Sequence, residues 1–304
     1  EYEKLSLEKT VEHTRAYLKV QDGCNQFCSY CIIPYARGRV RSRRKEEVVE
    51  EVKTLAGNGC KEVVLTGIHL SSYGIDHGST LQELILAVHE VAGVERIRLG
   101  SLEPGIITED FVKTLSALPK FCPHFHLSLQ SGCDATLKRM NRRYTSGEYY
   151  EKCILIRKYF KHPALTTDVI VGFPGETEED FEDTMDVVEQ VKYDSAFTFI
   201  YSKRTGTPAA AMEDQVPEEV VKARFDRLLK RIQEISAEKT QAGAGAVEDV
   251  LVEDVNKQEE GYVTGRTAKN YLVHFPGDES MIGKIVPVKL CESKGFYYYG
   301  KVVE

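Results

Sequence analysis

Two hydrophobic patterns alternate along residues 16–240. Short apolar runs predict strands, and longer stretches with an apolar residue every three or four positions predict amphipathic helices. In one such stretch Val48, Val52 and Leu55 recur at helical spacing before Gly57. Strands are expected at 16–20, 63–66, 97–99, 124–130, 166–171 and 196–201. Helices are expected at 44–56, 80–92, 109–118, 134–140, 147–160, 177–192 and 217–240, the last starting at Pro217.

The order of these elements gives six strand-then-helix units. Such an alternation predicts an α/β fold with a parallel sheet and right-handed crossovers. Six units are too few for a full eight-fold barrel, so an open partial barrel and a doubly wound sheet both fit. In either fold, functional residues are expected at the carboxyl ends of the strands.

The pattern changes at residues 243–304. A Gly-Ala-Gly linker at 243–245 is followed by five short apolar runs separated by Gly and Asp, which predict a small all-β barrel. Its strands are expected around 250–252, 261–265, 271–275, 284–290 and 296–303. We therefore expect two domains, 1–242 and 243–304.

The composition is that of a globular protein with a sizeable core, since 42% of the residues are hydrophobic and 29% are charged. No stretch of about 18 apolar residues predicts a membrane span, and no signal-peptide pattern opens the chain. The net charge of −7 excludes a non-specific nucleic-acid coat but allows a local basic patch for RNA. Because the chain begins at Glu1 rather than Met, we expect a fragment or a processed product.

The cysteines carry the candidate chemistry. In a long chain without a secretion signal they indicate a reducing cytoplasm rather than disulfides. Cys24, Cys28 and Cys31 follow the first strand with the spacing Cys-x3-Cys-x2-Cys. Three thiolates on one loop can converge on an inorganic cluster, and three ligands on a four-iron cluster leave one iron open for a small molecule. The alternative is a structural zinc loop, completed by a distant residue such as Cys60, in a non-catalytic RNA-binding protein. The other cysteines, expected as buried thiols, are at 60, 122, 133, 153 and 291.

This loop resembles the cluster motif of the radical S-adenosylmethionine (SAM) superfamily, which has the same spacing and an aromatic residue, here Tyr30, before the third Cys. The resemblance implies that Cys24, Cys28 and Cys31 bind a [4Fe-4S] cluster. It implies that the open iron chelates S-adenosyl-L-methionine, whose reductive cleavage yields methionine and a 5′-deoxyadenosyl radical. It also implies a partial (β/α)6 barrel fold.

Further segments resemble the methylthiotransferase subfamily. They are residues 31–43 behind the third Cys, 129–132 together with 140–144, 168–177, and 201–209. The C-terminal barrel resembles the TRAM domain, an RNA-contacting module that ends these enzymes. The resemblance implies a transferase that methylthiolates C2 of an adenosine at tRNA position 37, beside the anticodon.

Three branches of this subfamily act on isopentenyladenosine in tRNA, on N6-threonylcarbamoyladenosine in tRNA, or on an aspartate of a ribosomal protein. Residues 20–23, 33–37 and 66–74 look most like the bacterial threonylcarbamoyladenosine branch. We therefore expect N6-threonylcarbamoyladenosine as the substrate, with the other two as alternatives.

The subfamily also has an N-terminal domain with three further Cys and a second [4Fe-4S] cluster, which this sequence lacks. We expect the chain to cleave SAM but not to complete methylthiolation alone. The resemblance implies tRNA, a reductant such as flavodoxin and a sulfur source as partners, and no membrane.

Besides Tyr30, the candidate cofactor contacts follow the ends of predicted strands, where this architecture places its ligands. Each could be a structural residue alone, and together they form a rim. Gly172 resembles the adenine-binding turn of the superfamily, where close backbone approach needs glycine. The set is Gly67, Ser101, Glu103, Gln130, Asp168, Gly172 and Arg204.

Basic residues supply the candidate RNA contacts. Four of them follow the Cys loop at alternate positions, and we expect them to meet RNA phosphates. A cofactor carboxylate or plain solvent are the alternatives. Two more lie at a turn of the C-terminal barrel, which alternatively only packs against the larger domain. The candidates are Arg37, Arg39, Arg41, Arg43, Arg266 and Lys269.

Overall fold

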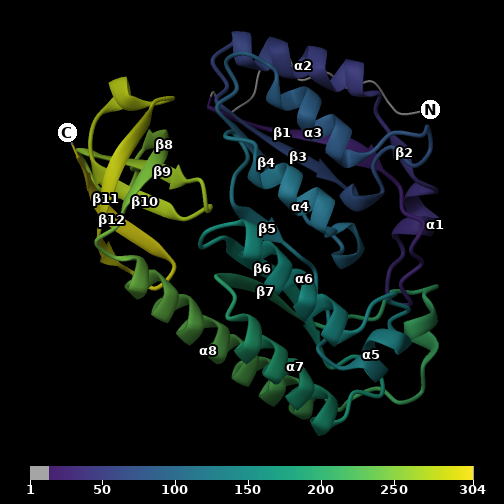
Figure 1. Ribbon diagram of the computed structural model, residues 1–304. Helices are drawn as coiled ribbons and strands as arrows, with labels where there is room; N and C mark the ends of the chain where they lie inside the picture. Colours follow the sequence, from purple (N-terminus) through teal and green to yellow (C-terminus); the bar gives the residue numbers. More distant parts are fainter. Residues whose placement is uncertain (1–13, 304) are drawn as a thin grey trace.

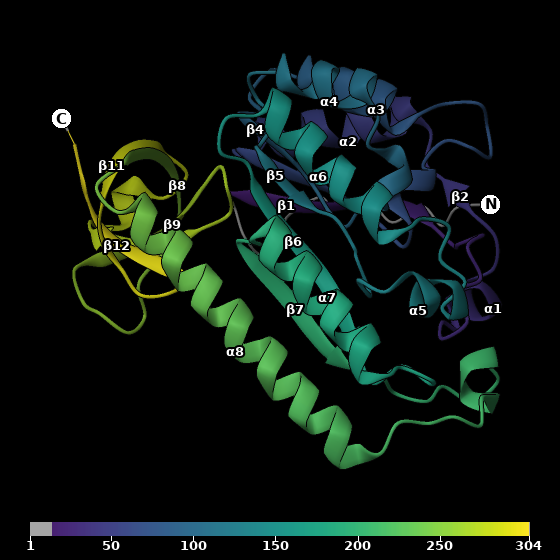
Figure 2. The same ribbon diagram turned by 60° about the horizontal axis from the view of Figure 1, so that its bottom comes forward.

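The computed structural model describes residues 14–303, so the first residues of the predicted N-terminal domain lie outside the described part. Six parallel strands each lead into a helix on the outer face of a curved sheet (Figures 1 and 2). The strands are β1 (Arg15–Asp22), β3 (Glu62–Gly67), β4 (Arg96–Leu99), β5 (His124–His126), β6 (Ala164–Val171) and β7 (Ser195–Ile200). The helices are α2 (Lys45–Gly57), α3 (Leu81–His89), α4 (Glu109–Ser116), α6 (Ser146–Tyr159), α7 (Glu178–Val191) and α8 (Glu218–Gly243).

The strand order decides between the two predicted architectures. The ladders run β2-β1-β3-β4 and β5-β6-β7, and parallel bridges Ile97–Phe121 and Leu102–Leu127 continue the sheet between them. The parallel strands therefore follow one another in chain order, whereas a doubly wound sheet reverses its direction part-way. This confirms the partial (β/α)6 barrel, open between β1 and β7.

Alternation along the strands places the core between sheet and helices. On β1, Ala16, Leu18 and Val20 are buried in the main core, while Tyr17 is 52% exposed on the inner face of the curve. Side chains of a strand point to its two faces in turn, so the sheet has an apolar outer face and an inner face free for ligands.

The helices begin where the sequence supplies caps. Thr80 and Thr145 each form a capping box with the glutamate three residues on, and Thr177 does so with Asp180. Most predicted bounds hold within a few residues. Pro217 is the N-cap residue that precedes α8 rather than a residue of its first turn, and the helix extends to Gly243.

The fourth predicted strand, 124–130, is wrong in length. Only His124–His126 form β5, because the chain leaves the regular ladder and Gln130 takes a left-handed backbone with φ of 68°. A bridge between Gln130 and Val169 keeps this segment beside β6. The short elements α1 (Ile33–Arg37) and β2 (Arg41–Ser42) were not predicted. The helix expected at 134–140 is confirmed as α5 (Asp134–Arg139).

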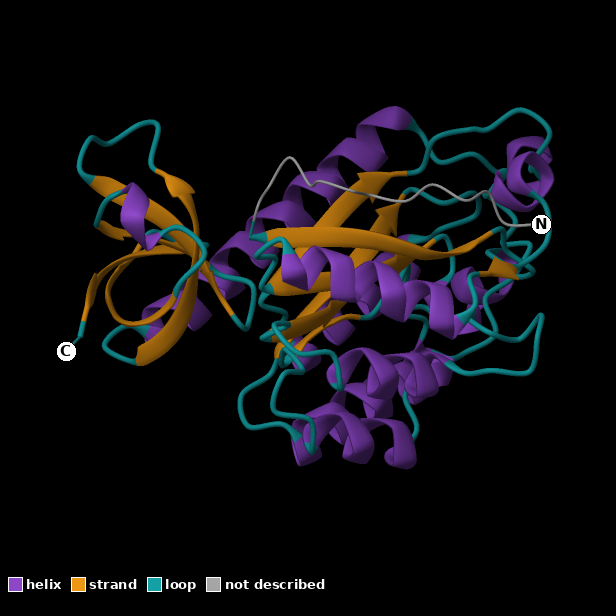
Figure 3. Ribbon diagram, turned by 90° about the horizontal axis from the view of Figure 1, so that it is seen from above, coloured by secondary structure: helices purple, strands orange, loops and turns teal. Residues whose placement is uncertain are grey.

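The predicted β-barrel is confirmed with all five strands. They close in the order β10-β12-β11-β8-β9 around a second core that includes Val252, Val273 and Phe275. The barrel lies beside the amino ends of the parallel strands, at the left of Figure 1, and Figure 3 shows the same separation from above. The domain boundary at 242/243 stays an interpretation, since α8 crosses it. The strands are β8 (Val247–Val255), β9 (Tyr262–Thr267), β10 (Leu272–Pro276), β11 (Ile285–Ser293) and β12 (Tyr297–Val302).

Within residues 14–303, none of the helices has the length and apolar character that crossing a bilayer needs.

Candidate active site

The cysteine loop lies at the carboxyl end of β1. Cys24 comes two residues after the strand, and the loop returns so that its amide donates to the carbonyl of Gly38 (3.1 Å). This return requires glycine at position 23, where φ is 69° and a Cβ would lie 2.0 Å from the carbonyl oxygen of Arg39. The sequence therefore folds into a tight turn that presents its thiols at the mouth of the barrel.

The three thiols form a donor set that fits a metal cluster. All are free, with Cys24 and Cys28 buried and Cys31 partly exposed. Burial, and then the negative charges of the two neighbouring thiols, raises the pKa of Cys24, so the three groups lie within each other's electrostatic reach. The backbone N–H of Gln26 donates to Cys24 Sγ (3.4 Å), and Arg142 Nη1 donates to Cys28 Sγ (3.2 Å). Thiolate ligands with such donors are typical of iron–sulfur sites.

The zinc alternative with Cys60 is wrong. Cys60 lies just before β3, which runs parallel to β1, and its thiol donates to the carbonyl of Glu62 (3.2 Å). It therefore sits at the opposite end of the sheet from the loop, roughly 20 Å away for strands of this length. Within residues 14–303 no group of three or more His, Cys, Asp or Glu side chains is placed to hold a single metal ion such as zinc.

Glu103 joins the loop to the strand ends. Its Oε2 accepts from Gln26 Nε2 and from His69 Nε2 (both 3.1 Å), and Arg142 Nη2 lies 3.4 Å from Oε1. Burial alone would raise the pKa of this carboxyl, but the His69 hydrogen bond and Arg142 outweigh burial and lower it. An ionised carboxylate and a guanidinium thus lie beside the thiols.

The other candidate residues divide into two groups. Asp168 and Gln130 are brought together, because the backbone N–H of Gln130 donates to the backbone carbonyl of Asp168 (2.8 Å). The Tyr30 ring packs edge-on against the ring of Phe173, next to Gly172, with 6.2 Å between the ring centroids. Ser101 and Arg204 are exposed at the rim, and neither side chain bonds to another candidate within the described range.

Comparisons with known proteins agree with this geometry. Residues 18–188, more than half of the chain, match the family described as the radical SAM superfamily, and residues 242–303 match the TRAM domain. The chain belongs to the radical SAM superfamily. Members of this superfamily bind a [4Fe-4S] cluster and SAM, so the fit of the thiols to a cluster and the partial barrel have one explanation.

Curated relatives are close along nearly the whole chain. A protein of Lachnoclostridium phytofermentans named tRNA-2-methylthio-N(6)-dimethylallyladenosine synthase is 48% identical, over 95% of this chain and 64% of its own length. A protein of Acetivibrio thermocellus with the same name is 46% identical, over 99% and 63%. The chain thus spans a little under two thirds of the length of these relatives.

Solved structures share the fold at low identity. Coproporphyrinogen III oxidase (HemN) from Escherichia coli superposes with a TM-score of 0.55 at 13% identity, covering 96% of this chain and 73% of that one. The radical SAM methyltransferase TsrM from Kitasatospora setae gives 0.54 at 18% identity, covering 77% and 41%.

Three residues to which the sequence assigned no role contact the cysteine loop or Glu103. Arg142 contacts Cys28, Glu103 and the Tyr144 hydroxyl (3.1 Å) at once. His69 and Gln26 complete the shell of Glu103. Arg142 lies in one of the segments that carried the subfamily resemblance, and this was the one signal that could have pointed to it.

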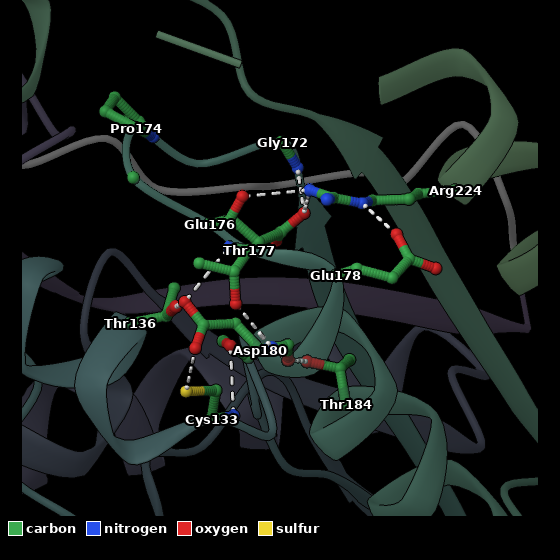
Figure 4. A network of polar contacts seen from close by, with 12 residues as sticks. Cys133, Thr136, Gly172, Pro174, Glu176, Thr177, Glu178, Asp180, Thr184 and Arg224 are labelled. Atoms are coloured by element: carbon green, nitrogen blue, oxygen red, sulfur yellow. Dashed lines mark hydrogen bonds and ion pairs between the residues drawn. The ribbon is translucent and has the colours of Figure 1, made fainter. Parts of the chain in front are cut away.

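Gly67 and Gly172 are needed for packing. A Cβ on Gly67 would lie 2.7 Å from Gln21 Oε1, and one on Gly172, where φ is 75°, would lie 2.5 Å from Val221 of α8. The turn after β6 is further fixed by Arg224 of α8, which donates to Glu176 Oε1 (2.9 Å), while the same carboxylate accepts from the Gly172 amide (3.1 Å; Figure 4). Helix α8 therefore holds the turn in which Gly172 was predicted to meet the cofactor.

Three of the four arginines after the cysteine loop form ion pairs within the protein. Arg43 forms an ion pair with Glu51 (2.6 Å) and is 13% exposed, so this predicted RNA contact is committed to the protein interior. Arg37 and Arg41 share Asp22 (3.6 and 3.4 Å). Arg39 is exposed and lies over the ring of Phe27 (4.7 Å), which makes it the best placed of the four for a phosphate.

The two basic candidates of the TRAM domain are also paired. Arg266 contacts Glu253 (3.0 Å) and Lys269 contacts Glu248 (2.6 Å). Their turn faces the larger domain, because Arg98 donates to the carbonyl of Ala268 (2.8 Å). The geometry therefore favours the alternative that this turn packs against the partial barrel, and RNA binding by Arg266 and Lys269 stays a prediction.

Proposed function

We propose that this chain is the catalytic part of a tRNA methylthiotransferase that acts on N6-dimethylallyladenosine, also called isopentenyladenosine, at position 37. The observation that carries the proposal is the group of three thiols at the barrel mouth with Arg142 and Glu103 beside them, in a chain 44–48% identical to synthases named for this product. Because tRNA is modified where it is used, the proposal places the enzyme in the cytoplasm.

The substrate differs from the one first expected. Residues 20–23, 33–37 and 66–74 suggested the threonylcarbamoyladenosine branch. Relatives that match over 95–99% of the chain carry the dimethylallyladenosine name, and agreement along the whole chain outweighs three short segments. The ribosomal-protein branch has no support among these relatives.

The residues divide the work as follows. Cys24, Cys28 and Cys31 would hold the cluster, which supplies the electron for SAM cleavage. Arg142 holds the thiol of Cys28 and the carboxylate of Glu103 in place, and His69 and Gln26 orient that carboxylate. The cofactor contacts of Tyr30, Gly67, Ser101, Glu103, Gln130, Asp168, Gly172 and Arg204 remain proposals, as do the reductant, the sulfur source and the second cluster.

Anaerobic reconstitution with iron and sulfide tests the catalytic part. We expect a visible charge-transfer absorbance and formation of 5′-deoxyadenosine from SAM, both lost in Cys24→Ser, Cys28→Ser and Cys31→Ser. Cys291→Ser, at an exposed cysteine of the TRAM domain, is the matched control and should change neither. One equivalent of zinc without iron would overturn the proposal.

Nucleoside mass spectrometry of tRNA from cells lacking the gene tests the substrate. Loss of the methylthio group from dimethylallyladenosine is the expected result. Loss from threonylcarbamoyladenosine would instead restore the first expectation.

A further inference from the structure

Two phenylalanines lie uncovered on the inner face of the partial barrel. Phe197 is 60% and Phe199 51% exposed, although both belong to a regular strand of the sheet. Strand β7 pairs with β6 in the register Asp168–Phe197 and Ile170–Phe199, so each ring shares a face with its partner on β6. The His126 ring lies 5.7 Å from the Phe197 ring, which fixes this face as the inner one.

Apart from the contact of Phe197 with the His126 ring, more than half of each phenylalanine side chain is uncovered in the described structure. The outer face of the same strand is the one that packs against α8, while the inner face has no helix over it (Figure 2). Adjacent exposed aromatic side chains mark a surface that a ligand or partner covers. Ligands of a β/α barrel bind on the inner face at the carboxyl ends of the strands. Phe199, the next-to-last residue of β7, lies at that end, and Phe197 lies two residues before it.

Polar contacts connect this surface to the cysteine loop. Ser128 Oγ donates to Asp168 Oδ2 (3.0 Å), and the carbonyl of Ser128 accepts from the Tyr144 hydroxyl (3.0 Å). Arg142 Nε donates to that hydroxyl (3.1 Å) and its Nη1 to Cys28 (3.2 Å). These contacts link Asp168, the strand partner of Phe197, to the thiol of Cys28.

The charge beside the rings is negative. His126 Nε2 and Ser128 Oγ both donate to Oδ2 of Asp168 (3.0 Å each), which leaves its Oδ1 without a hydrogen bond among residues 14–303. The guanidinium groups farther down the inner face are engaged, since Arg15 and Arg98 both contact Glu62 (2.9 and 2.7 Å). An apolar ligand, or one with an N–H to donate, suits this surface, and a carboxylate does not.

We propose that Phe197 and Phe199 receive the hydrocarbon group on N6 of the target adenosine, and that Asp168 disfavours bases whose N6 group carries a carboxylate. The inference rests on the proposed function and names the residues that set its substrate. A five-carbon dimethylallyl group is neutral and apolar, whereas the threonylcarbamoyl group is anionic. The surface thus favours the first base over the second.

Binding of anticodon stem-loop RNA to the reconstituted protein tests the proposal. Three RNAs differ only at position 37, with dimethylallyladenosine, threonylcarbamoyladenosine or adenosine, and their affinities are measured by fluorescence anisotropy at one salt concentration. We expect the native chain to favour dimethylallyl RNA over unmodified RNA by about tenfold or more, the size usual for burying a few carbon atoms. Phe197→Ser and Phe199→Ser together should bring this ratio close to one, and Phe197→Leu, which keeps an apolar side chain, should preserve most of it.

Phe296→Ser is the matched control, because Phe296 is 72% exposed and lies on the TRAM domain. It should leave the ratio unchanged. Asp168→Asn should raise the affinity for threonylcarbamoyl RNA relative to the native chain.

The outcomes separate this inference from the proposed function. A dimethylallyl preference that survives the serine substitutions overturns the inference alone. Loss of 5′-deoxyadenosine formation without RNA in the same variants also overturns it, because the rings would then serve SAM. A native preference for threonylcarbamoyl RNA overturns the inference and the proposed substrate while leaving SAM cleavage intact, and the absence of both cluster and cleavage overturns the proposed function itself.

Discussion

The two ends of the partial barrel are each built around one glutamate, and the two sites differ in what completes them. At the amino ends of the strands Glu62 is fully buried, with Arg98 at 2.7 Å and Arg15 at 2.9 Å. At the carboxyl ends Glu103 is 15% exposed and contacts Arg142, His69 and Gln26. Burial opposes ionisation in both, and the neighbouring donors still lower the pKa of each carboxyl.

The difference lies in the outer shell. Two of the arginines around Glu62 also donate hydrogen bonds to backbone carbonyls of the TRAM domain. Arg98 donates to Ala268 (2.8 Å) and Arg96 donates to Asp249 (2.6 Å). Arg142, beside Glu103, instead donates a hydrogen bond to the thiol of Cys28. The first network joins the two domains, whereas the second ends on a thiol at the open mouth, where a ligand can reach it. The first should matter for stability and the second for chemistry.

The largest expected effect is at Glu62. Glu62→Ala leaves Arg15 and Arg98 buried without their carboxylate, and we expect the free energy of unfolding to fall by about 3–5 kcal/mol, as when one partner of a buried ion pair is removed. Urea denaturation followed by circular dichroism measures it. A loss below about 1 kcal/mol would contradict the structural role of this end.

Glu103→Ala should affect SAM cleavage more than stability. The Glu103 side chain is 15% exposed, and Arg142 keeps its hydrogen bond to Cys28 without it, so we expect a stability loss of about 1–2 kcal/mol. Formation of 5′-deoxyadenosine should fall at least tenfold, because Arg142 and His69 lose the group that orients them. Cluster content from iron and sulfide analysis is the control. Full activity at normal cluster content would remove Glu103 from the site.

Acid should separate the two ends further. The folded-state pKa of Glu62 lies below its ordinary value of 4.5, so its contribution to stability is present above that pH and is lost as the pH falls through the folded pKa. The native chain should therefore lose more stability than Glu62→Gln when the pH is lowered from 6 to below about 4. Urea midpoints measured across this range test the expectation, and parallel curves for the two proteins would contradict it.

How much of each end the sequence predicts follows from the distance along the chain between the contacting residues. The cysteine loop is local, with its three thiols inside eight residues, so its spacing and its place after a strand were enough. Arg98 was expected only as part of a strand, because the carbonyl it contacts is 170 residues away. Arg142 meets a thiol 114 residues away, and no periodicity reports such a contact. Paired arginines such as Arg43 show the same limit, since a run of charge does not reveal which members have buried partners.

The smallest expected effect concerns the basic run after the cysteine loop, at the mouth of the barrel. Here too, arginines with buried partners should serve stability, and exposed arginines should be able to bind a ligand. If Arg39 meets a tRNA phosphate, Arg39→Gln removes one released counterion, and the slope of log affinity against log salt should fall by about 0.7–0.9. Arg43→Gln should leave this slope unchanged and lower stability instead, because its guanidinium is held by Glu51 (2.6 Å) inside the protein.

Measuring RNA affinity at several salt concentrations, together with SAM cleavage in the absence of RNA, distinguishes a phosphate contact from a cofactor contact and from a solvated side chain. An arginine that serves the cofactor carboxylate would impair cleavage without changing the slope, and a solvated arginine would change neither. Arg39 is favoured for the phosphate because it is exposed and has the ring of Phe27 beneath it, whereas the exposed Arg37 is paired with Asp22.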